Sequence, residues 1–163
     1  MPRDPIAELV HLYADAVVHH NGDQWGACWA PDAHWELGKG RRVEGRDAIL
    51  ELWHGAMGTF AAVVQTVLNG TYELDDDAGT GAGRWYIQEH FQRDTGDKGK
   101  LLAHYNDTYV RVDGRWLFNS RELVIHYGGP QDLSGDFLYA WVDVLSVYPP
   151  TATSRGARLG GSH

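Results

Sequence analysis

Cysteine is nearly absent from the sequence. Cys28 is the only one among 163 residues, so the chain can form no disulfide within itself. A chain without disulfides fits a reducing compartment, and we expect a cytoplasmic protein. Because Cys28 lies in the apolar stretch between Trp25 and Trp29, we expect a buried, unreactive thiol rather than a nucleophile.

Positive charge and long apolar runs are also scarce. The chain has 14 Lys and Arg against 22 Asp and Glu, a net charge of −8 at pH 7. Nucleic acids are bound by clustered cations, and the pair Arg41–Arg42 is too short for such a surface. No apolar run approaches the roughly 20 residues that span a bilayer, and the first residues lack a signal-peptide pattern. We therefore expect no nucleic-acid partner and no membrane partner.

The sequence lacks the common cofactor and metal motifs. It has no GxGxxG after a strand, no P-loop and no GxSxG. Of the nine histidines only His19 and His20 are adjacent, and adjacent side chains diverge on a helix. We expect no cofactor and no metal site.

Aromatic residues are plentiful, with seven Trp and eight Tyr. Most should fill the core, although such residues also line pockets for rings. The length suits one domain, which we expect over residues 1–148, with a flexible tail over 149–163.

The hydrophobic periodicity changes along the chain. Apolar residues at helical spacing predict helices over 5–20 and 46–60, with a short helix over about 23–30 and a brief strand over 33–38 between them. Period-two patterns then predict four long strands, over about 62–75, 81–93, 100–112 and 115–127. Short Gly- and Asp-rich turns separate these strands, which predicts an antiparallel meander covered by helices, an α+β fold.

A carboxylic acid stands out in the second long strand. Trp85, Ile87, Glu89 and Phe91 share one face, and three of the four are apolar. Desolvation there would raise the pKa of Glu89 and suit it to proton transfer near neutral pH. The alternatives are a salt bridge at the rim of the sheet, or a face that is less buried than these neighbours suggest.

Other candidates are less clearly placed. His104 and Asn106 share a face of the third strand, but periodicity leaves open whether that face or the Tyr105 face is inside. Tyr13 and Trp53 lie on the apolar faces of the first and third helices. Thr66 lies on the more apolar face of the first long strand and is the inward candidate there. Among the histidines, His126 lies near the end of the last strand, where it could flank a pocket mouth.

The segments "WAPDAHWEL", "VEGRDAI", "NGTYEL", "GRWY" and "VDGRWLF" occur in an order that resembles SnoaL-like proteins of the nuclear-transport-factor-2 superfamily. The resemblance covers about residues 5–127. It implies a cone-shaped, curved antiparallel sheet covered by three N-terminal helices, assembly as a homodimer or homotrimer, and acid–base chemistry in an apolar pocket without a cofactor.

The resemblance also implies roles for single residues. Dehydratases and dehydrochlorinases of this kind place an Asp near the end of the first helix and a His on the first long strand. Ungapped spacing puts Val18 and Thr66 there, and neither can act as a base. Tyr13 and Glu89 match functional positions of the bile-acid dehydratase. His104 and Asn106 match polar pocket positions of scytalone dehydratase, which implies that they face inward.

We therefore expect a lyase, isomerase or cyclase that acts on a small, hydrophobic, ring-containing substrate. The expected catalytic residues are Glu89, His104 and Tyr13. The expected substrate-binding residues are Asn106, Thr66, Trp53, Phe91 and His126. Two alternatives stay open: a non-catalytic binding domain, and an assembly module like the small subunits of ring-hydroxylating dioxygenases.

Overall fold

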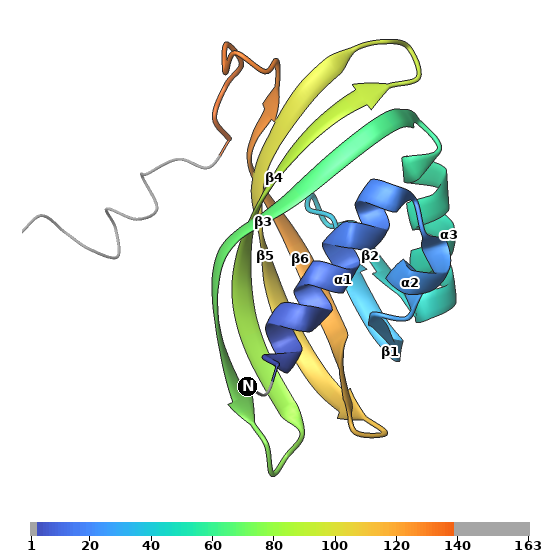
Figure 1. The fold of residues 1–163 in the computed structure, drawn as a ribbon, viewed down its shortest axis with the longest axis vertical. Helices are drawn as coiled ribbons and strands as arrows, with labels where there is room; N and C mark the ends of the chain where they lie inside the picture. Colours follow the sequence, from blue (N-terminus) through green and yellow to red (C-terminus); the bar gives the residue numbers. More distant parts are fainter. Residues whose placement is uncertain (1–2, 139–163) are drawn as a thin grey trace, which may run out of the picture.

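The computed structural model describes residues 3–138, which form three helices and one long sheet (Figure 1). The helices are α1 (Pro5–His19), α2 (Gly22–Gly26) and α3 (Arg46–Met57). The strands are β1 (Trp29–Glu36), β2 (Arg42–Glu44), β3 (Phe60–Asp75), β4 (Thr80–Arg93), β5 (Lys98–Val112) and β6 (Arg115–Gly129). The predicted α+β class and the order of helices and long strands are confirmed.

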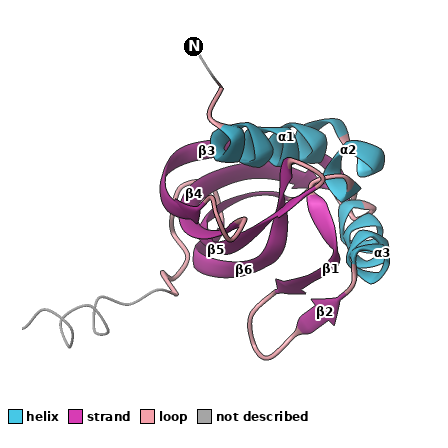
Figure 2. Cartoon of the chain, turned by 90° about the horizontal axis from the view of Figure 1, so that it is seen from below, coloured by secondary structure: helices cyan, strands magenta, loops and turns pink. Residues whose placement is uncertain are grey.

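The six strands form one sheet in the order β2-β1-β6-β5-β4-β3. Strands β3 to β6 pair as the antiparallel meander that the turns predict. Strand β1 instead runs parallel to β6, so the sheet is mixed rather than purely antiparallel. Figure 2 shows the sheet curving around α1, with the helices on its concave side. The curvature gives the sheet a concave face toward the helices and a convex face away from them.

The segment between the first and third helices differs from its prediction. Helix α2 ends at Gly26, and strand β1 begins at Trp29. The backbone changes direction there because the Phe118 amide donates to the Cys28 carbonyl, and Trp29 then pairs with Phe118. The segment from Gly38 to Gly45 contains the short strand β2, which pairs with β1 after a tight turn.

Helix α1 is fixed at both of its ends. The Asp4 carboxylate caps the first turn by accepting from the backbone amides of Ile6 and Ala7, at 3.0 and 2.9 Å. The other carboxylate oxygen of Asp4 accepts from the Tyr72 hydroxyl at 2.6 Å, which ties the start of the helix to β3. His20 ends the helix in the left-handed conformation, with φ of 51°.

Tryptophans dominate the core between the helices and β1. Trp25 stacks on Trp53 with ring centroids 4.7 Å apart, and it also meets Trp29 and Trp35 at 5.4 Å. All four side chains are buried. Cys28 is buried beside them, and burial raises the pKa of its thiol to about 12, in line with the expected unreactive role.

A buried ion pair joins β5 to β6 beneath this core. Arg121 donates from Nε and Nη2 to the two carboxylate oxygens of Asp107, at 2.8 and 3.1 Å. The guanidinium carbon lies 3.7 Å from the ring centroid of Tyr105 and 4.3 Å from that of Tyr13. The cation is therefore enclosed between aromatic faces and balanced by one carboxylate.

The chain beyond β6 turns back on itself. The Tyr127 hydroxyl donates to the Pro130 carbonyl at 2.6 Å, and its ring packs against that of Phe137. The structure describes this segment only as far as residue 138. The domain end at 148 and the tail over 149–163 lie outside the described residues.

No helix within residues 3–138 is long and apolar enough to cross a bilayer.

Candidate functional site

Glu89 lies on the concave face of the sheet, as its apolar neighbours predict. The side chains on either side of it on that face are Ile87 and Phe91, and Leu101 is its cross-strand partner on β5. The buried side chain of Gln65 donates from Nε2 to Glu89 Oε1 at 2.6 Å. Burial raises the pKa of Glu89, and the bond from Gln65 only partly opposes that rise.

Glu89 is enclosed but still accessible. Its side chain keeps an intermediate exposure, as do the neighbouring apolar side chains of Phe91 and Leu101. No other hydrogen bond or ion pair of its carboxylate occurs within residues 3–138. One carboxylate oxygen is therefore held in place by Gln65, while Oε2 has no such partner in the described part of the chain.

The charge of this acid affects two tyrosines. Tyr13 of α1 and Tyr105 of β5 meet edge to face with ring centroids 5.9 Å apart. Burial raises the pKa of Tyr13 to about 12, and the charge of Glu89 adds to the rise. The pKa of Tyr105 is also raised, mainly by burial, again with a contribution from Glu89. Both phenols therefore stay protonated at neutral pH and can donate hydrogen bonds.

His104 and Asn106 occupy the opposite, convex face, so the expectation that they point inward is wrong. Tyr105 lies between them in the strand and contacts α1, and alternate side chains of a strand point to opposite faces. Asn106 accepts from Arg84 at 2.9 Å and donates to Glu122 at 3.1 Å. On β5, the face that meets the helices is the one that includes the bulky Tyr105, and the alternation of apolar residues along the strand does not identify it.

His104 is nonetheless buried on that convex face. Its Nδ1 lies 2.6 Å from Nε2 of His126, and the ring of Tyr86 packs beside both imidazoles. Burial, together with the charge of His126, lowers the pKa of His104 to about 4, so the ring is neutral at pH 7. His126 therefore belongs to this outer pair and does not lie beside Glu89.

On the first long strand, the side chain that faces inward is that of Gln65 rather than that of Thr66. Thr66 is exposed on the convex face between Val64 and Leu68, whose side chains are half exposed. Gln65 faces inward instead, since it is the cross-strand partner of Glu89. The apolar side chains of the convex face predict the wrong side, so the sequence pattern does not identify Gln65, the residue that meets Glu89.

Trp53 and Phe91 face the interior, but they differ in accessibility. Trp53 is 3% exposed and stacked against Trp25, which leaves little of its ring for a ligand. Phe91 is partly exposed beside Phe60, with a centroid separation of 5.4 Å, and the Arg93 guanidinium lies over both rings. Of the two, Phe91 is the ring that can contact a molecule next to Glu89.

Residues 3–138 contain no group of three or more His, Cys, Asp or Glu side chains arranged to hold a metal ion.

Comparison with known protein families identifies the family to which this chain belongs. The sequence model of the SnoaL-like domain matches residues 2–122, about three quarters of the chain. The chain belongs to the SnoaL-like family. No protein of curated function matches this SnoaL-like sequence.

Solved structures share the fold of this SnoaL-like chain at low sequence identity. A proposed scytalone dehydratase of Novosphingobium aromaticivorans has a TM-score of 0.71 and 21% identity, covering 76% of this chain and 83% of its own. LinA has a TM-score of 0.71 and 22% identity, with coverages of 83% and 92%. The hexachlorocyclohexane dehydrochlorinase LinA-type3 of Novosphingobium barchaimii reaches 0.70 at 19% identity, with the same coverages. At these identities the likeness establishes the fold alone.

The two positions that spacing assigned to an Asp–His pair are both poor sites for a base in this SnoaL-like chain. Val18 is 37% exposed near the end of α1, and its neighbour Val17 is the buried residue there. The exposed Thr66 has the amide Gln65 as its inward neighbour. The titratable group on this part of the concave face is therefore Glu89, supported by an amide rather than by an imidazole.

Proposed function

We propose that this SnoaL-like chain is a cofactor-free acid–base enzyme that acts on a small, apolar, ring-containing molecule at the concave face. The observation that supports it most is the Glu89 carboxyl, which is set among apolar side chains, held by Gln65 and raised in pKa by burial. A base whose pKa approaches the working pH combines the ionised form with useful proton affinity.

Glu89 is the proposed base. Its Oε2 would take a proton from a carbon next to a carbonyl, and the electron pair of the C–H bond would pass to the carbonyl oxygen as an enolate. Gln65 fixes Oε1 and thereby orients the carboxylate without supplying charge. Returning the proton to another carbon gives an isomerisation, and loss of a hydroxyl from the neighbouring carbon gives an elimination.

Tyr13 and Tyr105 are proposed to bind the substrate oxygen. Both are phenols that remain protonated, and both lie near enough to Glu89 for its charge to affect their pKa. A phenol can donate to the developing enolate oxygen, and in an elimination it can protonate the leaving hydroxyl. This assignment keeps Tyr13 in the site, adds Tyr105, and leaves out His104 and Asn106 because they lie on the other face.

The substrate class follows from the surroundings of Glu89. Phe91 and Leu101 offer partly exposed apolar surface next to Glu89, and the partly exposed Leu123 is the cross-strand partner of Tyr105. A compact ring with a single ketone or hydroxyl group matches this set, whereas a highly charged substrate does not. A chain of this kind would also need no membrane or nucleic-acid partner, and assembly with further copies remains a proposal for solution measurements.

Proton removal can be tested before the natural substrate is known. A panel of cyclic ketones is incubated with the protein in D2O, and deuterium uptake next to the carbonyl is followed by mass spectrometry. A positioned base typically contributes about 10²–10⁴-fold in rate, so Glu89→Gln should slow the exchange at least ten-fold. Glu51→Gln, on the exposed face of α3, is the matched control and should leave the rate unchanged.

A non-catalytic binding domain is the second candidate function. It is favoured by one feature, since Gln65 leaves Glu89 without a titratable side chain as its hydrogen-bond partner. A binding domain would be stabilised against heat by members of the same panel while catalysing no exchange. An exchange rate that is the same in wild type and Glu89→Gln would remove Glu89 from the mechanism.

A further inference from the structure

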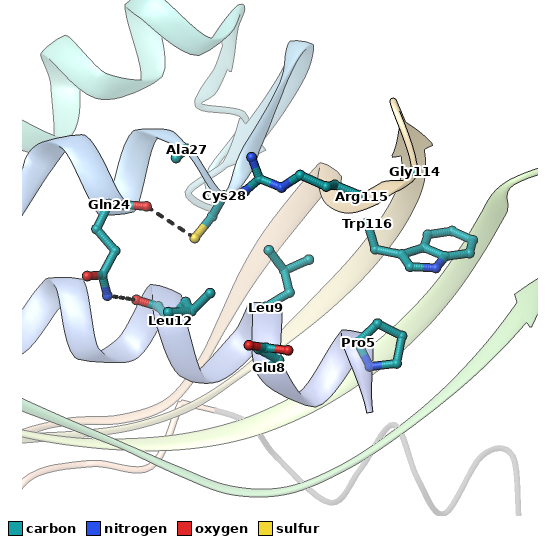
Figure 3. Close-up of a pocket in the computed structure, with 10 residues that line it drawn as sticks. All are labelled: Pro5, Glu8, Leu9, Leu12, Gln24, Ala27, Cys28, Gly114, Arg115 and Trp116. Atoms are coloured by element: carbon teal, nitrogen blue, oxygen red, sulfur yellow. Dashed lines mark hydrogen bonds between the residues drawn. The ribbon is translucent and has the colours of Figure 1, made fainter. Parts of the chain in front are cut away.

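A pocket lies at the opposite end of the sheet from Glu89. It has a volume of about 410 Å³ and lies between α1, α2 and the turn that joins β5 to β6 (Figure 3). Its lining residues are Pro5, Glu8, Leu9, Leu12, Gln24, Ala27, Cys28, Gly114, Arg115 and Trp116. None of them belongs to the site proposed around Glu89, so this end-pocket is a separate feature of the molecule.

The floor and one end of the end-pocket are apolar. Leu9 and Leu12 rise from α1, and Leu12 is 42% exposed, which is unusual for a large aliphatic side chain. The indole of Trp116 and the ring of Pro5 lie together at one end (Figure 3). A flat ring system could cover this surface and remove Leu12 from water.

The charges around the end-pocket are not balanced. Glu8 carries its own counter-ion, because Arg3 lies 3.2 Å from its carboxylate. Arg115 reaches from the hairpin toward Cys28 and Ala27, and its guanidinium has no hydrogen bond or ion pair within residues 3–138 (Figure 3). The end-pocket therefore has one uncompensated positive charge beside an apolar floor.

The side chains of Gln24 and Cys28 in the end-pocket already have hydrogen-bond partners. Gln24 donates from Nε2 to the Leu12 carbonyl at 2.8 Å and to Asp15 at 2.9 Å. The Cys28 thiol donates to the Gln24 carbonyl at 3.4 Å. Arg115 is thus the charged lining group that is available to a ligand, and a guanidinium pairs well with a planar carboxylate or with a sulfonate.

We propose that the end-pocket binds an amphipathic aromatic monoanion, with its acid group on Arg115 and its rings over Leu9, Leu12 and Trp116. A volume of about 410 Å³ is at the small end of the range for ligand sites, and this fits a molecule of two or three rings. The ligand is distinct from the proposed substrate of Glu89, because a neutral ketone cannot form an ion pair with the guanidinium of Arg115.

The probe for this proposal is 8-anilinonaphthalene-1-sulfonate, an aromatic monoanion whose fluorescence rises on binding. Titration of the folded full-length protein should give one saturable site. Arg115→Gln should weaken the affinity about five-fold, the scale of a partly exposed ion pair. Arg41→Gln removes a cation from the exposed turn between β1 and β2 and is the matched control, which should bind as the wild type does.

Two further variants separate this site from the rest of the molecule. Ala27 is exposed and lines the end-pocket, so Ala27→Trp should fill it and abolish binding without disturbing the core. Glu89→Gln should leave the probe affinity unchanged, which keeps this test independent of the proposed function. Wild-type affinity in both Arg115→Gln and Ala27→Trp would overturn the proposal, as would a loss of binding in Glu89→Gln alone.

Discussion

Replacing Asp107 by Asn should destabilise the protein severely, because it leaves Arg121 buried without a counter-ion. Both side chains are almost fully buried, with exposed fractions of 3% and 1%. The substitution keeps the size of the side chain and removes only its charge. Breaking a buried ion pair from one side typically costs about 3–5 kcal/mol.

The surroundings of the ion pair favour a loss of stability in the upper part of this range. Arg121 Nη1 has no partner within residues 3–138, and aromatic rings enclose the rest of the guanidinium. No described group can therefore take over from Asp107. For a domain of this length, a loss of about 3–5 kcal/mol corresponds to a fall in Tm of roughly 10–15 °C.

The assay is urea unfolding followed by tryptophan fluorescence, combined with thermal unfolding. Asp113→Asn is the matched control: it makes the same chemical change at the exposed turn between β5 and β6, where φ is 50° and Asn is well tolerated. It should change the free energy of unfolding by less than about 0.5 kcal/mol. Replacing the pair together, as Asp107→Leu with Arg121→Met, should cost less than Asp107→Asn alone. A loss below about 1 kcal/mol for Asp107→Asn would refute this reasoning.

Three further predictions concern the acid, a cap and the glycines. Burial raises the folded-state pKa of Glu89, so the wild type should lose stability as pH rises from about 4 through that pKa. Glu89→Gln removes this titration and should gain stability relative to wild type as pH rises in urea unfolding; parallel curves would contradict it. Asp4→Ala removes the α1 cap and a hydrogen bond to β3, so it should lower the free energy of unfolding in urea by about 2 kcal/mol. A loss of less than about 0.5 kcal/mol would contradict this role of Asp4. Gly70→Ala would bring a Cβ to 2.4 Å from the Trp85 ring and should cost about 1–3 kcal/mol of stability. Gly55→Ala, in open space on α3, should instead stabilise the protein by about 0.5–1 kcal/mol. Equal melting temperatures of the two variants would refute this contrast.

The meander could be predicted because its signals are local. Period-two alternation marks each long strand, and Asp113–Gly114 marks the tight turn between the last two. The parallel pairing of β1 with β6 could not be predicted, since it joins segments almost 90 residues apart and has no turn of its own. Its presence changes only the edge of the sheet and leaves the concave face around Glu89 as expected.

The site was predictable for Glu89 and Tyr13, whose apolar neighbours fix the direction in which they point. It was not predictable for His104 and Thr66. In both strands the two faces have similar hydrophobicity, because the convex face keeps exposed aliphatic residues such as Val64. A one-residue error of this kind moves a side chain to the other face of the sheet. The sequence pattern therefore does not identify Tyr105 and Gln65 as inward residues.

The cross-strand partner of Asp107 also could not be predicted from the sequence. Counting back from the turn, where Val112 pairs with Arg115, places Ser120 opposite Asp107. A bulge between Thr108 and Tyr109 shifts the register by one residue, and Arg121 becomes the partner instead. The sequence therefore contains both charges of the pair, but the irregularity that brings them together depends on tertiary packing.

The most direct test of the proposed chemistry is the titration of the Glu89 carboxyl itself. Carbon-13 NMR of the side-chain carboxyls, with Glu89→Gln to assign the signal, reports its pKa in the free protein without a substrate. The account predicts a pKa for Glu89 clearly above the ordinary glutamate value of about 4.3. A pKa at or below that value would show that the acid is well solvated on the concave face, and it would contradict its assignment as the base.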